Sequence, residues 1–120
     1  MKPLRRLALA ALCVAGAAQA ADDEAPWPVA GRQGIIRIVI VPTAQAADRA
    51  AYVRQIERLC GTAETCFLNF YTNATGAPVT VPLPDAIAEE ASAVLRRSGK
   101  QHTEGFRFAC RLKTGDDTCF

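Results

Sequence analysis

The stretch that decides the fold class is Gly34-Ile35-Ile36-Arg37-Ile38-Val39-Ile40-Val41-Pro42. Its residues are β-branched almost throughout, which is typical of a strand, and the proline ends the run. Both faces of the segment are apolar except at Arg37. The sequence therefore predicts a strand that is covered on both sides or that lies beside a parallel neighbour.

A helix is predicted directly after this strand, over residues 49–60. Asp48 is a favourable N-cap, although Thr43 could start the helix earlier, and Gly61 is well placed to end the helix. Apolar residues at helical spacing predict a buried stripe made of Val53, Ile56, Leu59 and Cys60. A second strand is predicted over residues 66–72, so that strand, helix and strand form a right-handed crossover unit.

The second half of the chain predicts one more helix and one more strand. Asp85 is the expected cap of a helix over residues 86–97, with a buried stripe of Ile87, Ala91, Val94 and Leu95. Residues 79–84 are proline-rich and extended, and residues 106–112 alternate as a strand does. The expected fold is a small two-layer α/β domain (βαβ-αβ) with a three-stranded sheet and two helices on one face.

The amino terminus reads as an export signal over residues 1–20. Three basic residues precede an apolar run that is too short to span a bilayer, and Ala18-Gln19-Ala20 is a suitable cleavage site. Cleavage would change the formal net charge from +2 to −1, because it removes three basic residues and no acidic ones. Without a basic excess we expect no nucleic-acid binding, and because the apolar run is too short we expect no stable membrane span. The predicted location is the periplasm or the medium of a Gram-negative bacterium.

Residues 21–33 mix charges, prolines and glycine without a hydrophobic period, so they are predicted to be a flexible leader before a single domain over residues 34–120. Trp27 is the exception in this leader. It is either an exposed docking residue or a side chain that folds back onto the domain, and the large area that a tryptophan buries favours the second.

Four cysteines remain after removal of the signal, which contains Cys13. An even number in a small exported domain predicts two disulfides, with three pairings open. We favour the local pairs Cys60–Cys66 and Cys110–Cys119, because they need no assumption about strand order. Oxidised cysteines cannot bind zinc, so we expect no metal site, and no motif indicates a cofactor.

One group of residues suggests a binding surface. If Cys66, Leu68 and Phe70 face the helices, their neighbours Phe67, Asn69 and Tyr71 face away, and we expect three arginines, Arg37, Arg107 and Arg111, on the same face. Arginines among aromatic residues suit an anionic or sugar-like ligand or a partner protein. The alternative is an ordinary solvated face whose arginine stems cover apolar neighbours.

Catalysis would have to depend on His102, the only histidine, together with Glu104 or Lys100 in a concave pocket. The leading hypothesis is a non-enzymatic exported interaction module whose partner is an envelope or extracellular protein or a small anionic ligand. The alternatives are a small secreted enzyme, an enzyme inhibitor and a purely structural envelope protein.

Overall fold

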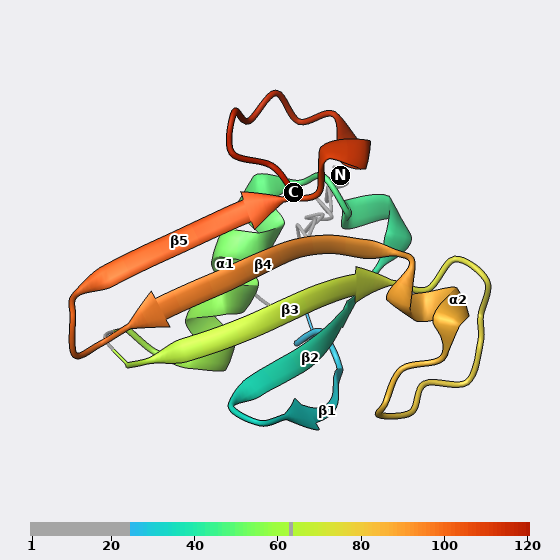
Figure 1. Cartoon of the computed structure of the whole chain (residues 1–120), viewed down its shortest axis with the longest axis horizontal. Helices are drawn as coiled ribbons and strands as arrows, with labels where there is room; N and C mark the ends of the chain where they lie inside the picture. The colour runs from blue at the N-terminus through green and yellow to red at the C-terminus, as the bar shows by residue number, and fades with distance from the viewer. Residues whose placement is uncertain (1–24, 63) are drawn as a thin grey trace, which may run out of the picture.

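The computed structural model describes residues 25–62 and 64–120. These residues form one five-stranded sheet, one helix of several turns and three short helical segments (Figure 1). The strands are β1 (Val29–Gln33), β2 (Ile36–Val41), β3 (Cys66–Thr72), β4 (Ala91–Ser98) and β5 (Thr103–Phe108). The helical segments are η2 (Thr43–Gln45), α1 (Arg49–Cys60), α2 (Asp85–Ala88) and η3 (Cys110–Leu112).

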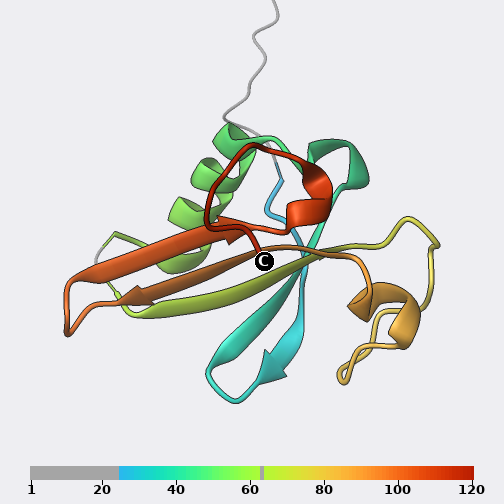
Figure 2. The ribbon, with the colours of Figure 1, turned by 45° about the horizontal axis from the view of Figure 1, so that its top comes forward.

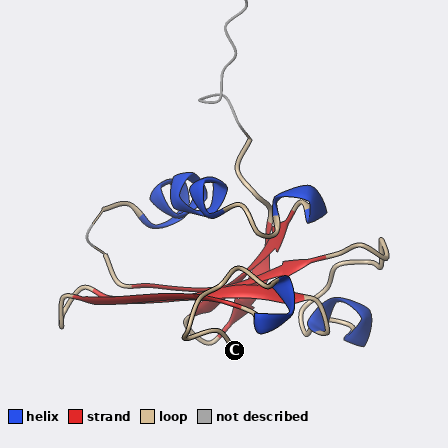
Figure 3. Cartoon of the chain, turned by 90° about the horizontal axis from the view of Figure 1, so that it is seen from above, coloured by secondary structure: helices blue, strands red, loops and turns tan. Residues whose placement is uncertain are grey.

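The strands follow the order β1-β2-β3-β4-β5 across the sheet. The pair β2 and β3, which α1 connects, is parallel, and the other three neighbouring pairs are antiparallel. Helix α1 covers one face, whereas α2 and η3 lie toward the other side (Figure 3). The mixed α/β class and the parallel strand–helix–strand unit are thus confirmed, but the predicted three-stranded sheet with two helices on one face is wrong.

The first additional strand is β1, which lies in the segment that was predicted to be a flexible leader. Gly34 and Ile35 form a two-residue turn between β1 and β2, and Gly34 has φ 66°. Glycine at the first central position is favoured in such hairpin turns, because they need a positive φ there. The sheet therefore begins at Val29, before the predicted domain boundary at residue 34, whereas the predicted signal over residues 1–20 lies outside the described residues.

The second additional strand is β4, which replaces most of the helix predicted over residues 86–97. Only Asp85–Ala88 is helical. Alanine, glutamate, leucine and arginine have high helix propensity, which explains the wrong prediction. In the structure β4 pairs with β3 on one side and β5 on the other, and Ala93 and Leu95 are fully buried on the face that α1 covers. Hydrogen bonding on both sides and burial of alternate residues outweigh a preference of a few tenths of a kcal/mol per residue.

The last strand is shifted relative to its prediction over residues 106–112. It begins at Thr103 and ends at Phe108, because the chain turns into η3 after Ala109. Two main-chain bonds mark this turn: Cys110 N donates to Phe120 O at 2.7 Å, and Phe120 N donates to Phe108 O at 3.1 Å. Figure 2 shows the C-terminal segment looping back to the end of β5.

Helix α1 has the predicted bounds and the predicted cap. The carboxylate of Asp48 accepts a hydrogen bond from Ala51 N at 3.2 Å, and the helix ends at Gly61, which has φ 71°. The predicted buried stripe is right at Ile56 and Cys60 and wrong at Val53, whose side chain is half exposed. The stripe is rotated toward its other buried members, Ala51, Tyr52 and Gln55.

An aromatic cluster fills the space between α1 and the sheet. Tyr52 is at its centre, with ring centroids 5.0 Å from Trp27, 5.0 Å from Phe70 and 5.2 Å from Phe108. Trp27 is almost fully buried, and its backbone N–H donates to the Gln55 side chain at 2.8 Å. The prediction that this tryptophan folds back onto the domain is confirmed.

Both local disulfides, Cys60–Cys66 and Cys110–Cys119, are present. The first joins the end of α1 to the start of β3 within the core, and the second closes the C-terminal segment onto η3. Arg49 at the start of α1 also holds this segment, because its guanidinium contacts the Asp116 carboxylate at 2.7 Å and lies 4.9 Å from the centre of the Phe108 ring.

Candidate binding surface

The face of the sheet that points away from α1 carries the predicted aromatic and amide residues of β3. Along this strand Cys66, Leu68 and Phe70 are buried, whereas Phe67, Asn69 and Tyr71 are partly exposed. The alternation expected for β3 is therefore correct. Arg107 joins this face, because it pairs with Val94, which in turn pairs with Asn69.

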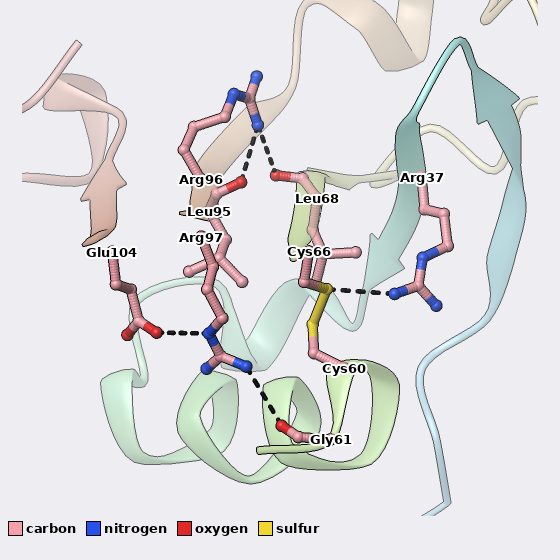
Figure 4. Close-up of a disulfide and its surroundings, with 9 residues drawn as sticks. All are labelled: Arg37, Cys60, Gly61, Cys66, Leu68, Leu95, Arg96, Arg97 and Glu104. Atoms are coloured by element: carbon pink, nitrogen blue, oxygen red, sulfur yellow. Dashed lines mark hydrogen bonds and ion pairs between the residues drawn. A yellow bond between two sulfur atoms is a disulfide. The ribbon is translucent and has the colours of Figure 1, made fainter. Parts of the chain in front are cut away.

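The other two predicted arginines do not join it. Arg37 pairs with Leu68, so it projects to the side of the sheet on which α1 lies, and its Nη2 is 3.1 Å from Cys66 Sγ (Figure 4). Arg111 belongs to η3 and donates to Ala91 O at 3.1 Å. Both placements correct the prediction. Arg37 lies on the α1 side because the register of β2 and β3 pairs it with Leu68. Arg111 is not on the sheet because β5 ends at Phe108.

Arg96 of β4 is the arginine that the sequence reasoning missed. Its Nη1 donates to Leu95 O at 2.9 Å and Leu68 O at 3.2 Å, and its Nη2 donates to Asn69 Oδ1 at 2.8 Å. Arg96 and Arg97 point to opposite sides of the sheet (Figure 4). Val94 and Arg96 alternate with the buried Ala93 and Leu95, and this alternation could have indicated a strand. The high helix propensity of the segment led to the helix prediction instead.

The guanidinium of Arg96 also lies over an aromatic neighbour. Its guanidinium carbon lies 5.6 Å from the centre of the Phe67 ring, which is within the range of a cation–π contact. Arg107 has a similar arrangement, with its guanidinium carbon 5.6 Å from the centre of the Phe120 ring. Each arginine on this face is thus stacked on a phenylalanine.

We call this surface the open face and define it by strand residues that project away from α1. No strand residue that projects to this side is acidic. Its members are Gly31, Gln33, Ile36, Ile38, Ile40, Phe67, Asn69, Tyr71, Ala91, Val94, Arg96, Ser98, Thr103, Gly105 and Arg107.

The β1 end of the open face is closed and the β5 end is accessible. Val81 lies so close to Gly31 that a Cβ on this glycine would be 2.8 Å from Val81 Cγ2, and Ile38, which pairs with Gly31, is fully buried. At the other end Gly105 lies opposite Arg96, and no atom lies within 4 Å of a Cβ built there. The open face is therefore most accessible around Arg96, Gly105 and Arg107.

A carboxylate next to the sheet has a structural role rather than a place on this surface. Glu90 accepts a hydrogen bond from Thr72 Oγ1 at 2.6 Å and another from Ala74 N at 2.9 Å. The hydrogen bond from Thr72, followed by that from Ala74, lowers the pKa of Glu90 below its ordinary value. The ionised carboxylate thereby orders the turn that follows β3.

His102 lies in the turn between β4 and β5 and does not form the acid–base pair that the enzyme alternative requires. It is exposed, in a left-handed conformation with φ 54°, and it lines a cavity of about 250 Å³ together with Glu104. The nearby carboxylate of Glu104 instead accepts from Arg97 Nε at 2.6 Å (Figure 4). Arg97 also donates to Gly61 O at 3.2 Å, so this ion pair connects β4 and β5 to the end of α1.

Over residues 25–62 and 64–120, no helix has the length and apolar character that crossing a membrane requires. In the same part of the chain, no group of three or more His, Cys, Asp or Glu side chains is arranged to hold a metal ion. Comparison with protein-family models, curated proteins and solved structures found no match to this chain.

Proposed function

We propose that this protein is an exported, non-enzymatic interaction module whose open face binds an acidic surface of another protein. The observation that carries the proposal is the pair Arg96 and Arg107. Both are stacked on aromatic rings, on a face whose strands supply no acidic side chain. The expected alternatives, an enzyme, an inhibitor or a structural envelope protein, have no comparable support in the geometry.

Arg96 is pre-organised to bind a carboxylate. Its contacts to two main-chain carbonyls and to Asn69 hold the guanidinium in one orientation, so little side-chain entropy remains to be lost on binding. Among the described residues, its Nε–H and one Nη2–H have no acceptor. A carboxylate that approaches the planar edge of the guanidinium would accept from both.

Arg107 adds a second cation on the same face. It is exposed, and the described residues provide no acceptor for its guanidinium. Because Arg107 pairs with Val94 and Arg96 pairs with Gly105, the two arginines are diagonal neighbours, about 7–8 Å apart between their Cα atoms. Two cations at this separation favour a partner with more than one carboxylate.

Aromatic and aliphatic side chains surround the cations. Phe67 and Val94 are partly exposed, and Phe120 is 42 % exposed. Arginine and aromatic residues are enriched where proteins bind each other, whereas aspartate and glutamate are depleted there. This composition favours a protein surface, rather than a fully solvated small ion, as the ligand of the open face.

The proposal is tested by titrating the 15N-labelled protein with a short synthetic peptide of alternating Glu and Tyr, and with its Gln/Tyr counterpart. We expect the Glu/Tyr peptide to shift the amide signals of Phe67, Asn69, Arg96 and Arg107, and to bind more weakly as salt is added. Arg107→Gln should weaken binding about tenfold, the loss expected for one charge-assisted contact.

Gly105 offers a matched pair of variants for the same titration. Gly105→Glu places a competing carboxylate directly opposite Arg96 in open space and should abolish binding, whereas Gly105→Ala should retain it. Equal affinity for the two peptides, or signal changes confined to other parts of the chain, would contradict the proposal.

Export is part of the same proposal. Two disulfides are typical of an oxidising compartment, such as the periplasm or the medium, and they support the interpretation of residues 1–20 as a cleaved signal. An envelope or extracellular protein is then the class of partner that the open face would meet.

A further inference from the structure

We infer that Arg32 and Arg37 form a second binding site, which shares only Phe67 with the open face, for an oxyanion that carries an apolar group. The two arginines are directly opposite each other in the β1–β2 hairpin. They lie near the turn formed by Gly34 and Ile35, so the register of the hairpin keeps them together. The site goes beyond the proposed function, because Arg37 projects to the side of the sheet on which α1 lies.

The pair is electrostatically unfavourable without a ligand. Like charges directly opposite each other in an antiparallel pair are destabilising, because their Cβ atoms are only about 4.5–5.5 Å apart. Among the described residues, no acidic side chain forms an ion pair with Arg32 or Arg37. A bound anion would remove the repulsion and satisfy the free donors of both guanidinium groups.

A cavity of about 250 Å³ adjoins both arginines. Its lining consists of Arg32, Ile35, Arg37, Thr65, Cys66 and Phe67. This volume is small for a drug-sized ligand, but it accommodates a phosphate or carboxylate group with a short substituent.

The donors at the cavity are partly held in place. Cys66 Sγ accepts from Arg37 Nη2 at 3.1 Å, which orients this guanidinium and leaves its remaining N–H groups without an acceptor among the described residues (Figure 4). Thr65 Oγ1 accepts from Gly99 N at 2.8 Å, so the proton of this hydroxyl is left to donate. Two guanidinium groups and one hydroxyl therefore offer hydrogen bonds to one oxyanion.

The apolar part of the ligand is indicated by Ile35. Its side chain is 65 % exposed at the tip of the hairpin, and it lines the cavity together with Phe67. An exposed isoleucine beside two arginines suits an anion whose substituent covers the apolar side chain. This chemistry is shared by a free organic phosphate and by the headgroup region of an anionic phospholipid.

The experiment uses hexyl phosphate, inorganic phosphate and vesicles of phosphatidylcholine with phosphatidylglycerol as probes. In the wild type, hexyl phosphate should shift the Nε–H signals of Arg32 and Arg37 saturably and bind more tightly than inorganic phosphate. Arg32→Gln and Arg37→Gln should each weaken binding about tenfold, because each removes a charged donor. Arg107→Gln, which removes the same charge from the open face, is the matched control and should bind normally.

A second readout is independent of the arginine signals. Hexyl phosphate should raise the thermal midpoint of the wild type and of Arg107→Gln, but not that of Arg32→Gln, whose substituted side chain is exposed and leaves the fold intact. Vesicle binding that depends on Arg32 and Arg37 would identify a lipid headgroup as the source. Binding of hexyl phosphate without vesicle binding would identify a free organic anion.

The inference is overturned if hexyl phosphate does not bind saturably, or if Arg107→Gln weakens binding as much as Arg37→Gln does. Loss of peptide binding in Gly105→Glu with normal binding of hexyl phosphate would show that the two sites are independent. A failure of the open face is therefore distinguishable from a failure of the hairpin site.

Discussion

Tyr52 is the side chain that connects α1 to the sheet most directly. Its ring is at the centre of the aromatic cluster, and its hydroxyl donates to Ala46 O at 2.7 Å. Because that proton is used, Ser92, whose Oγ is 2.9 Å away, donates to the tyrosine oxygen. The register between β3 and β4 shifts between Phe70, which pairs with Ala93, and Tyr71, which pairs with Ala91. Ser92 is the extra residue at this shift, and it is fully buried.

Burial of Tyr52 should make the stability of the protein fall at alkaline pH. Desolvation raises the pKa of Tyr52 from 10.0 to about 12, although the hydrogen bond from Ser92 opposes part of the rise. Above pH 10 the unfolded chain loses the phenol proton while the folded protein keeps it. The free energy of unfolding should therefore decrease between about pH 10 and 12, by about 2–3 kcal/mol in total.

Urea unfolding followed by circular dichroism across this pH range measures the effect, and Tyr52→Phe is the control. The variant should be less stable at neutral pH by about 1–3 kcal/mol, because Ala46 O and Ser92 Oγ lose their partner. It should, however, lack the contribution of Tyr52 to the alkaline decrease. Parallel pH curves for the two proteins would show that Tyr52 is not the group responsible.

The arginines show why single residues were placed less well than the strands that carry them. Alternation along one strand assigns Phe67, Asn69 and Tyr71 to one face, but it does not say which face of a neighbouring strand matches it. A shift of one residue in the register reverses every side chain. Arg37 was assigned to the wrong face for this reason, although β2 itself was predicted nearly to its observed bounds.

At the scale of elements, α1 and β3 were predicted with their observed bounds because their signals are local. A capping aspartate, a terminal glycine and an alternating strand all lie within a few residues of the structure they determine. By contrast, β4 is a strand because it pairs with β3 and β5, and both of these strands lie outside its own segment of sequence. Its local composition favours a helix, so tertiary hydrogen bonding decided the outcome.

The two disulfides should differ in their effect on stability. Each closes a short loop and should contribute roughly 2–3 kcal/mol through the unfolded state. Cys60 and Cys66 are also buried in the core, whereas Cys110 is exposed. The double variant Cys60→Ala with Cys66→Ala should therefore lose more, about 3–5 kcal/mol, because it also leaves unfilled space.

Urea unfolding of this double variant, compared with Cys110→Ala with Cys119→Ala, measures the difference. The second pair should cost about 2–3 kcal/mol, since the contact of Arg49 with Asp116 remains to hold the C-terminal segment. Equal losses in the two double variants would indicate that loop closure alone accounts for both disulfides.

At the scale of the whole molecule, both ends of the described chain pack against the same helix. Trp27 fills the core beside Tyr52, and Asp116 binds the side chain of Arg49. The segment before β2 is therefore part of the hydrophobic core rather than a leader to it. A domain of this size buries only about two thirds of the surface that its unfolded chain exposes, and these contacts contribute to that burial.

The covalent state of the whole chain tests the export proposal. Protein purified from its native compartment should begin at Ala21, and intact-mass measurement should show that the four cysteines after residue 20 do not react with an alkylating agent before reduction. After reduction and unfolding, all four should react. If residues 1–20 are still present and the four later cysteines react before reduction, both export and the oxidised state are contradicted.

The sequence by itself determined the α/β class, α1, β3, the local disulfides and the inward position of Trp27, because capping, alternation, short loops and the burial of a large aromatic side chain are local or strongly one-sided signals. Only the tertiary structure decided that β1 and β4 are strands, that Arg96 rather than Arg37 belongs to the open face, and that Arg32 and Arg37 are opposite each other. These features depend on register and strand pairing, which are properties of segments that meet in space and leave little trace in either segment alone.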